Sequence, residues 1–373
     1  MNVKVLLSIA LSLALICSGT SAWAKVSGTC ADCHTMHNSQ DGAAVEASPN
    51  RSLTKGDCVG CHTGTNASGG NIPYVTDTTA PTYSADGTGA TTLAGGSFYW
   101  VGTDDSTAHN VVGIKTADAN MPNNTPPGWD PAVSGNVIAG GTATWGSQLT
   151  CAGTYGCHGP HTAADDFEDI AGAHHGDDSA IDGTSTASSY RFLNGIVGIE
   201  DSDWEFQPTA SAHNGYKGAA RTAISAIGSE ANTDTISYFC ATCHGQYHSG
   251  TGVVNGGTVS IGTNPWLRHP SDYDMADTEA GAEYHFYNGT STPASATYST
   301  EAPVALSTPA VSSTVDVSTT GEAIVTCISC HRAHGSKYSD LLRWDYNSAS
   351  DSMIAGGGAN NTGCFICHTT KDD

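Results

Sequence analysis

Twelve of the thirteen cysteines in this 373-residue sequence occur as pairs, and a histidine follows every pair. In five of the pairs two residues separate the cysteines, the spacing of covalent c-type haem attachment. Two thiols reach the two vinyl groups of one haem, and the next residue directs its imidazole at the iron. A short turn between the cysteines places all three groups on one side of the backbone. The five motifs are Cys30, Cys33 and His34; Cys58, Cys61 and His62; Cys240, Cys243 and His244; Cys327, Cys330 and His331; and Cys364, Cys367 and His368.

The sixth pair, Cys151 and Cys157, has five residues between its cysteines and is followed by His158. Gly153 and Gly156 would let this longer loop bulge while both thiols still reach one haem. A local disulfide with His158 as a bystander is the alternative, because exported cysteines in even number usually form disulfides. The sequence therefore predicts five c-type haems from spacing alone and a sixth at this pair.

The second axial ligand of each iron is also expected to be histidine. Ten histidines remain beside the six in the motifs, while the five methionines lie in no ligand context. Bis-histidine ligation gives low-spin iron of low potential and closes both axial positions to substrate. The distal candidates are His37, His109, His174, His175, His213, His248, His269 and His334.

Three of these candidates, His37, His248 and His334, come three or four residues after a motif histidine. At that spacing the two side chains share a helical face, so both cannot reach opposite faces of one porphyrin. Each would bind a different iron, which brings neighbouring haems into contact, unless it is simply a solvated surface residue. Adjacent side chains diverge, so His174 and His175 are not expected to bind the same iron.

The composition alone would predict disorder. Leu, Ile, Val and Phe together make up 57 of the 373 residues, and the formal net charge is −23. Such a chain cannot build a side-chain core large enough to offset its conformational entropy. Six porphyrins would supply the missing apolar surface. The 13 Lys and Arg residues also exclude nucleic acid and anionic membrane surfaces as partners, because both require dense positive charge.

We therefore predict a mostly coil, haem-cored fold with short α-helices and few short strands. The intervals between motifs are rich in Gly, Thr, Ser and Ala and show no repeat, so 25–373 is interpreted as one hexahaem cytochrome c domain. Residues 1–24 have the features of a signal peptide, with an apolar run from Val5 to Cys17 and a small-x-small site at Ala22 to Ala24. The protein is expected to be exported, to the cell surface or outside it, with the periplasm as the alternative and no membrane span.

Acidic clusters offer a second, weaker metal chemistry. Ca²⁺ prefers carboxylate oxygens, and such an ion could tie loops together. Solvated acidic loops are the alternative. The clusters are Asp104 with Asp105, Asp165 with Asp166, Asp177 with Asp178, and Asp201 with Asp203.

The motif-bearing stretches 30–39, 240–248, 267–270 and 327–334 resemble those of the hexahaem outer-surface cytochromes of the OmcS type, which polymerise into conducting filaments. The haem number and a haem near the C-terminus agree with that family. The resemblance implies self-association into a polymer in which His37 binds a haem of the adjacent subunit. The unusual Cys151/Cys157 spacing and the lack of a histidine shortly after His62 depart from the family pattern.

Extracellular electron transfer through a nanowire subunit is the function that these observations favour, with other cytochromes or extracellular electron acceptors as partners. A monomeric periplasmic or secreted multihaem electron carrier is the alternative. A multihaem reductase would need an open iron position and cations that attract an anionic substrate, and the sequence provides neither. An electron-transfer protein is therefore expected in preference to an enzyme.

Overall fold

The computed structural model describes residues 25–26, 28–83, 89–129, 144–221, 231–249, 271–278, 285–290, 292–348 and 362–369. The expected signal peptide and the distal candidate His269 lie outside these residues. Most of the described chain is coil and turn, and its longest helix, α5, has six residues. The prediction of a mostly coil fold with short elements is confirmed. None of the helices in the described segments is long and apolar enough to cross a membrane.

The helices are one or two turns long. The α-helices are α2 (Cys30–Cys33), α3 (Cys58–Cys61), α4 (Asp166–Asp169), α5 (Ile236–Ala241), α6 (Gly245–Ser249) and α7 (Cys327–Cys330). The 3₁₀ helices are η1 (Phe98–Gly102), η2 (Asp105–Thr107), η3 (Pro122–Asn124), η5 (Ala173–His175), η6 (Tyr190–Phe192), η7 (Met275–Asp277), η8 (Pro293–Ser295), η9 (Ser339–Leu341) and η11 (Gly363–Ile366).

The strands form two-stranded pairs, some between neighbouring segments and others between segments far apart in the sequence. The antiparallel pairs join β1 (Ser39–Gln40) to β2 (Ala43–Ala44), β7 (Gly198–Ile199) to β8 (Gly215–Tyr216), β9 (Tyr273–Asp274) to β12 (Ile324–Val325), and β10 (Ala296–Thr297) to β11 (Thr314–Val315). The parallel pairs join β3 (Thr63–Gly64) to β4 (Thr76–Asp77) and β5 (Thr150–Ala152) to β6 (Gly156–His158).

Three small apolar clusters replace a single core in the described residues. One surrounds Met275, Tyr287 and Trp344, a second surrounds Tyr190, Tyr216 and Ile324, and a third contains Phe98, Val101, Ala108 and Val111. Motif cysteines pack against two of these clusters: Cys330, Cys364 and Cys367 against the first, and Cys151 against the third. The apolar side chains are thus gathered beside the attachment motifs.

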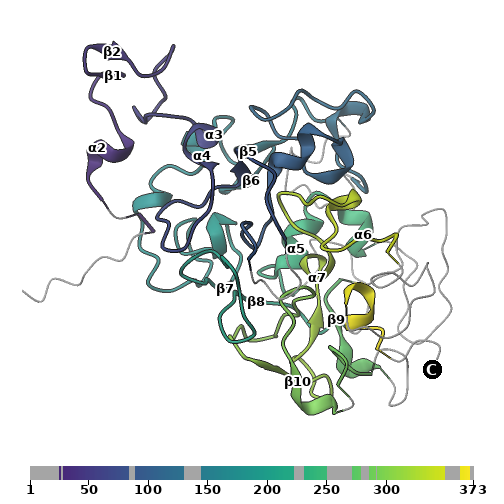
Figure 1. Cartoon of the computed structure of the whole chain (residues 1–373). Coiled ribbons are helices and arrows are strands. Elements are labelled where there is room, and N and C mark those ends of the chain that lie inside the picture. The colour runs from purple at the N-terminus through teal and green to yellow at the C-terminus, as the bar shows by residue number, and fades with distance from the viewer. Residues whose placement is uncertain are drawn as a thin grey trace, which may run out of the picture.

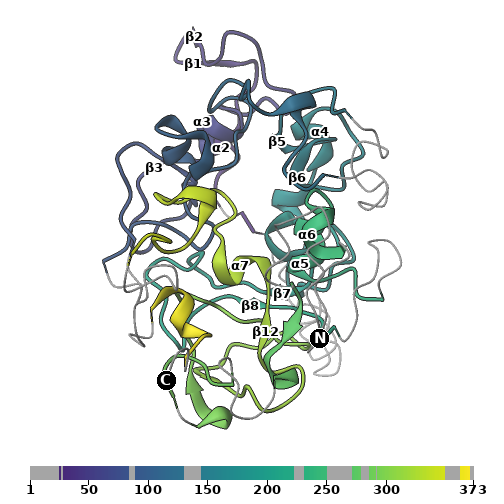
Figure 2. The same cartoon turned by 90° about the vertical axis from the view of Figure 1, so that its right-hand side faces the viewer.

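The N-terminal segment projects from the rest of the molecule. Figure 1 shows α2 and the β1–β2 hairpin reaching outward, and the view turned by 90° in Figure 2 shows the hairpin again at the edge. Helix η11, with the last motif, lies in the opposite half of the molecule (Figure 2). The first and last motifs therefore lie toward opposite ends of the described chain.

Candidate haem-binding sites

Three of the Cys-x-x-Cys motifs coincide with single helical turns, α2, α3 and α7. A turn places residues i and i+3 on one face, so the two thiols of a motif project to the same side. Capping fixes where each turn begins: the Asp57 carboxylate accepts the Gly60 N–H at 2.6 Å, and Ser329 Oγ accepts the Thr326 N–H at 3.0 Å. The motif at Cys240 continues from α5, and the motif at Cys364 lies on η11.

The sixth pair is built differently, because its cysteines lie on strands. Cys151 is in β5 and Cys157 in β6, and these strands pair in parallel with Ala152 opposite His158. Gly153 has a φ of +90°, and a Cβ on Gly156 would overlap the backbone of Ala152. All twelve motif cysteines are free thiols, so the alternative of a local Cys151–Cys157 disulfide is not formed in the structure.

Five of the six motif histidines donate Nδ1–H to a backbone carbonyl. A ligating histidine usually makes this second hydrogen bond, which fixes the tautomer and leaves Nε2 free for the metal. The pairs are His34 with Ser52 O at 2.9 Å, His62 with Pro73 O at 2.8 Å, His158 with Arg191 O at 2.9 Å, His244 with Pro127 O at 2.6 Å, and His331 with Asp340 O at 2.6 Å. The rings are thus oriented as iron ligation requires.

Three distal candidates lie opposite motif histidines. Two imidazoles on one iron have ring centroids about 6.3 Å apart, because a metal–nitrogen bond is about 2.0 Å and each centroid lies about 1.15 Å beyond its nitrogen. The observed separations are 6.2 Å for His34 and His175, 6.5 Å for His62 and His174, and 6.1 Å for His109 and His244. These separations fit an iron between the two rings of each pair.

His334 lies near several other histidines. Burial lowers its pKa to about 3, and the charges of His158, His109 and His62 lower it further. Burial likewise lowers the pKa of His174 to about 4 and that of His244 to about 4. Because a histidine must be neutral to bind a metal, the lowered pKa values keep these rings ready for ligation at neutral pH.

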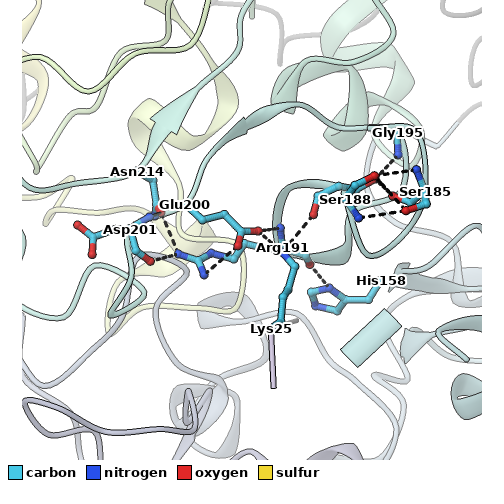
Figure 3. A network of polar contacts seen from close by, with 10 residues as sticks. Lys25, His158, Ser185, Ser188, Arg191, Gly195, Glu200, Asp201 and Asn214 are labelled. Carbon is cyan, nitrogen blue, oxygen red and sulfur yellow. Dashed lines mark hydrogen bonds and ion pairs between the residues drawn. The ribbon is translucent and has the colours of Figure 1, made fainter. Parts of the chain in front are cut away.

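The carbonyl that orients His158 belongs to a turn held by a partly buried ion pair between Lys25 and Glu200 (Figure 3). Arg191 has a φ of +48°, a left-handed conformation that residues other than glycine keep only when surrounding contacts stabilise it. Glu200 Oε1 accepts the Arg191 N–H at 2.5 Å and pairs with Lys25 Nζ at 2.5 Å. The Arg191 guanidinium donates to Asn214 Oδ1 at 3.0 Å. Sequence reasoning missed these residues, and no local pattern could have revealed them.

Motifs that follow one another in the sequence have thiols near one another in the structure. The Cys58 and Cys151 thiols lie within 4.8 Å of each other, and Cys330, Cys364 and Cys367 pack against the same apolar cluster. For the other neighbours the influence is electrostatic: beyond the effect of burial, Cys33 raises the pKa of Cys61 and Cys157 raises that of Cys243, while Cys327 raises that of Cys240.

The remaining distal candidates do not lie opposite a motif histidine in the described structure. His37 is exposed on the projecting N-terminal segment. Both ring nitrogens of His213 face backbone carbonyls, Asn214 O at 2.7 Å and Ser312 O at 3.2 Å, which leaves neither nitrogen for an iron. His248 lies against Arg221 Nη1 and Ser271 Oγ.

The acidic clusters act as local caps. In each cluster one carboxylate accepts a backbone N–H two or three residues later, a geometry typical of turns and helix N-termini. These contacts are Asp104 with Ser106 at 2.8 Å, Asp165 with Glu168 at 3.0 Å, Asp177 with Ser179 at 2.9 Å, and Asp201 with Asp203 at 3.1 Å. In the described residues the group with metal-ligand geometry is Cys58, Cys151 and Asp166, whose ligand atoms lie within 4.8 Å of one another.

Comparison with known proteins gives three matches. A family model described as a doubled CXXCH motif matches residues 319–373. The chain is similar to the Outer Membrane Cytochrome S filament from Geobacter sulfurreducens, with 19% identity, a TM-score of 0.45, and coverage of 93% of this chain and 100% of that one. The cryo-EM structure of the OmcS nanowires from the same organism gives the same values. No curated protein matches. The family model spans the fifth and sixth motifs along the chain, those that begin at Cys327 and Cys364.

Proposed function

We propose that this chain is an exported electron-transfer protein that carries six c-type haems in one row and serves as a subunit of an extracellular filament. The observation that carries this proposal is the set of three histidine pairs whose ring separations, 6.1 to 6.5 Å, fit an iron between the two rings. Electrons pass between haems only over short distances, and the closeness of the Cys58 and Cys151 thiols and of Cys330, Cys364 and Cys367 supports haems that lie near one another. Five haems follow from Cys-x-x-Cys-His spacing, and the sixth belongs to Cys151, Cys157 and His158.

Each iron takes two histidines in this proposal. His34 pairs with His175, His62 with His174, His244 with His109, and His158 with His334. Haem supplies the redox chemistry, while the protein positions the imidazoles and surrounds the porphyrins with apolar side chains. With both axial positions closed, no iron is open to substrate, which favours electron transfer over enzymatic reduction.

His331 is the motif histidine that a neighbouring subunit could complete. The residue is exposed, and it is not a member of the three histidine pairs described above. His37 is also exposed, on a segment that projects from the molecule (Figure 1). We propose that His37 binds a haem of the adjacent subunit, so that the row of haems continues through the polymer. The solved structures that this chain resembles are described as a filament and as nanowires.

We propose that the protein acts at the cell surface or outside the cell. Export through the signal peptide at 1–24 would deliver the chain to the cell surface or beyond it. Partners would be further copies of this chain, other cytochromes and extracellular electron acceptors. The net charge of −23 disfavours nucleic acid and anionic membrane surfaces. At the acidic clusters one carboxylate in each already accepts a backbone N–H, which favours solvated capping loops over Ca²⁺ sites.

Mass measurement and electron microscopy of the purified holoprotein test this function. We expect a chain with six attached haems that forms filaments, and a His37→Ala variant with six haems that stays monomeric. His285→Ala serves as the control and should polymerise. Globular particles from the wild-type chain would favour the monomeric carrier. Stoichiometric binding of carbon monoxide to the reduced wild-type protein would show an open iron and contradict electron transfer through closed haems.

A further inference from the structure

The loop between Cys151 and Cys157 must hold an unusual shape. A normal motif is closed by one helical turn, but here three additional residues separate the thiols, and no helical hydrogen bonds set their distance. A longer loop costs more conformational entropy to close. It also exposes backbone N–H groups that need acceptors once a porphyrin covers them. Some other part of the chain must therefore supply both the shape and the acceptors.

The Asp169 carboxylate supplies them. This side chain is 5% exposed and lies at the end of α4. Its Oδ2 accepts the N–H of Gly153 at 3.2 Å and the N–H of His161 at 2.9 Å. Its Oδ1 accepts the N–H of Thr162 at 2.7 Å, the N–H of Ala163 at 2.9 Å and the Thr162 hydroxyl at 3.3 Å. One buried carboxylate thus binds the enlarged loop and the segment that follows the motif.

Neighbouring contacts confine the loop around this carboxylate. Gly159 has a φ of +90°, and a Cβ there would overlap Asp169 Oδ2. Thr154 Oγ1 donates to the Ala163 carbonyl at 3.2 Å, so the loop also contacts the following segment directly. Asp166, on the same helix, has a carboxylate oxygen within 4.8 Å of the Cys151 thiol. Helix α4 therefore contacts the motif through two carboxylates, Asp169 at Gly153 and Asp166 near Cys151.

We propose that Asp169 is the positioning residue that shapes the enlarged Cys151–Cys157 loop for haem attachment. This inference rests on the proposed haem at Cys151, Cys157 and His158. Hydrogen bonds to a charged acceptor are stronger than neutral ones, and a buried carboxylate holds several N–H groups in a fixed geometry. With the loop held, both thiols face the vinyl groups together. Each thiol then adds across one vinyl group: its S–H bond breaks, an S–C bond forms, and the hydrogen goes to the other vinyl carbon, with no net oxidation.

The test compares haem content by intact mass and by peptide mapping. In Asp169→Asn the amide keeps the shape of the side chain, but an NH₂ donor replaces one of the two acceptor oxygens and then faces backbone N–H groups, and the negative charge is lost. We expect most Asp169→Asn chains to carry one haem fewer, with unmodified Cys151 and Cys157 in the mapped peptide and the other five sites filled. Asp177→Asn is the matched control, because Asp177 is exposed and caps only its own turn. It should keep all six haems.

A second variant separates shaping of the loop from a general structural role. Deleting Gly153, Thr154 and Tyr155 converts the pair to an ordinary Cys-x-x-Cys-His motif. In this shortened chain Asp169→Asn should no longer reduce haem content, even if the single variant yields no protein. The inference is overturned if Asp169→Asn keeps six haems, loses haem evenly from several sites, or still loses the haem at Cys151 and Cys157 in the shortened chain. A wild-type chain with unmodified Cys151 and Cys157 would instead contradict the proposed haem at this site.

Discussion

At the scale of single residues, the adjacent histidines His174 and His175 are the proposed distal ligands of two different haems. Their rings lie opposite the motif histidines of two different sites, His62 and His34. Both come from one short helix, η5, so a single peptide unit separates the distal ligands of the first and second proposed haems. Phe192 lies 4.9 Å from His174, centroid to centroid, and connects this pair to the turn that orients His158.

This arrangement predicts that His174→Ala and His175→Ala each open one iron, at different haems. Each variant should convert one haem from low to high spin and bind one carbon monoxide per chain when reduced, because only one axial ligand is lost. Electron paramagnetic resonance and carbon monoxide titration measure both effects. His161→Ala is the control, since its Nδ1 faces the Gly153 carbonyl at 3.3 Å, and it should leave all haems low-spin. Identical low-spin spectra for all three variants would contradict the pairing.

At the scale of elements, helix η6 has a strained backbone and positions the carbonyl that orients His158. Arg191 and Phe192 both have positive φ values, 48° and 61°, and only surrounding contacts can maintain such a turn. Glu200 is the centre of those contacts, through the Arg191 N–H and the Lys25 ammonium (Figure 3). Burial lowers the pKa of Lys25, and the neighbouring carboxylate of Glu200 opposes this shift. Lys25, the first residue of the predicted mature chain, thereby supports the proposed proximal ligand His158.

We therefore expect Glu200→Gln to destabilise the holoprotein by about 1–3 kcal/mol, because it leaves the Lys25 ammonium buried without its counter-charge. It should also shift the potential of one haem, the one bound by His158, since the Arg191 carbonyl would lose its fixed position. Denaturant unfolding and spectroelectrochemistry measure these effects.

The matched control for this change is Glu168→Gln. Glu168 pairs with Arg51 at 2.6 Å, but the two side chains are 52% and 58% exposed. An exposed ion pair contributes only about 0–1 kcal/mol, so this variant should unfold close to the wild-type midpoint with unchanged potentials. Equal effects of the two variants would mean that the Lys25–Glu200 pair has no special role.

At the scale of the whole molecule, the apolar content is organised around the attachment motifs. The three clusters of the described residues are small, and motif cysteines pack against two of them. Two-stranded pairs and caps fix the loops locally, but these elements are too short to be stable alone. Porphyrin faces would join the clusters into one interior.

The haem-free chain is accordingly expected to be unfolded. A variant in which serine replaces all twelve motif cysteines should show coil-like circular dichroism and rapid proteolysis, while the holoprotein resists both, because side chains alone bury too little apolar surface. A cooperative thermal transition in the haem-free chain would contradict this expectation.

The sequence alone identified much of the chemistry. Cysteine spacing predicted the attachment motifs, the surplus of histidine over methionine predicted histidine as distal ligand, and the scarcity of large apolar residues predicted a mostly coil fold. The motif predictions are possible from sequence because a covalent motif is local: its thiols and imidazole lie within a few residues, and their spacing sets their geometry. The fold class is confirmed, whereas the haem ligands stay predictions.

Only the tertiary structure decided which groups meet. His109 and His244 are 135 positions apart in the chain, yet their rings lie 6.1 Å apart. The same holds for the Arg191 carbonyl on His158 and for the Cys58 and Cys151 thiols, which lie within 4.8 Å of each other. No local signal marks such partners, because long coil intervals can return to any point of the molecule. Their path is set by many weak contacts, such as two-residue strand pairs and single carboxylates like that of Asp169, which act only when distant segments have already come together.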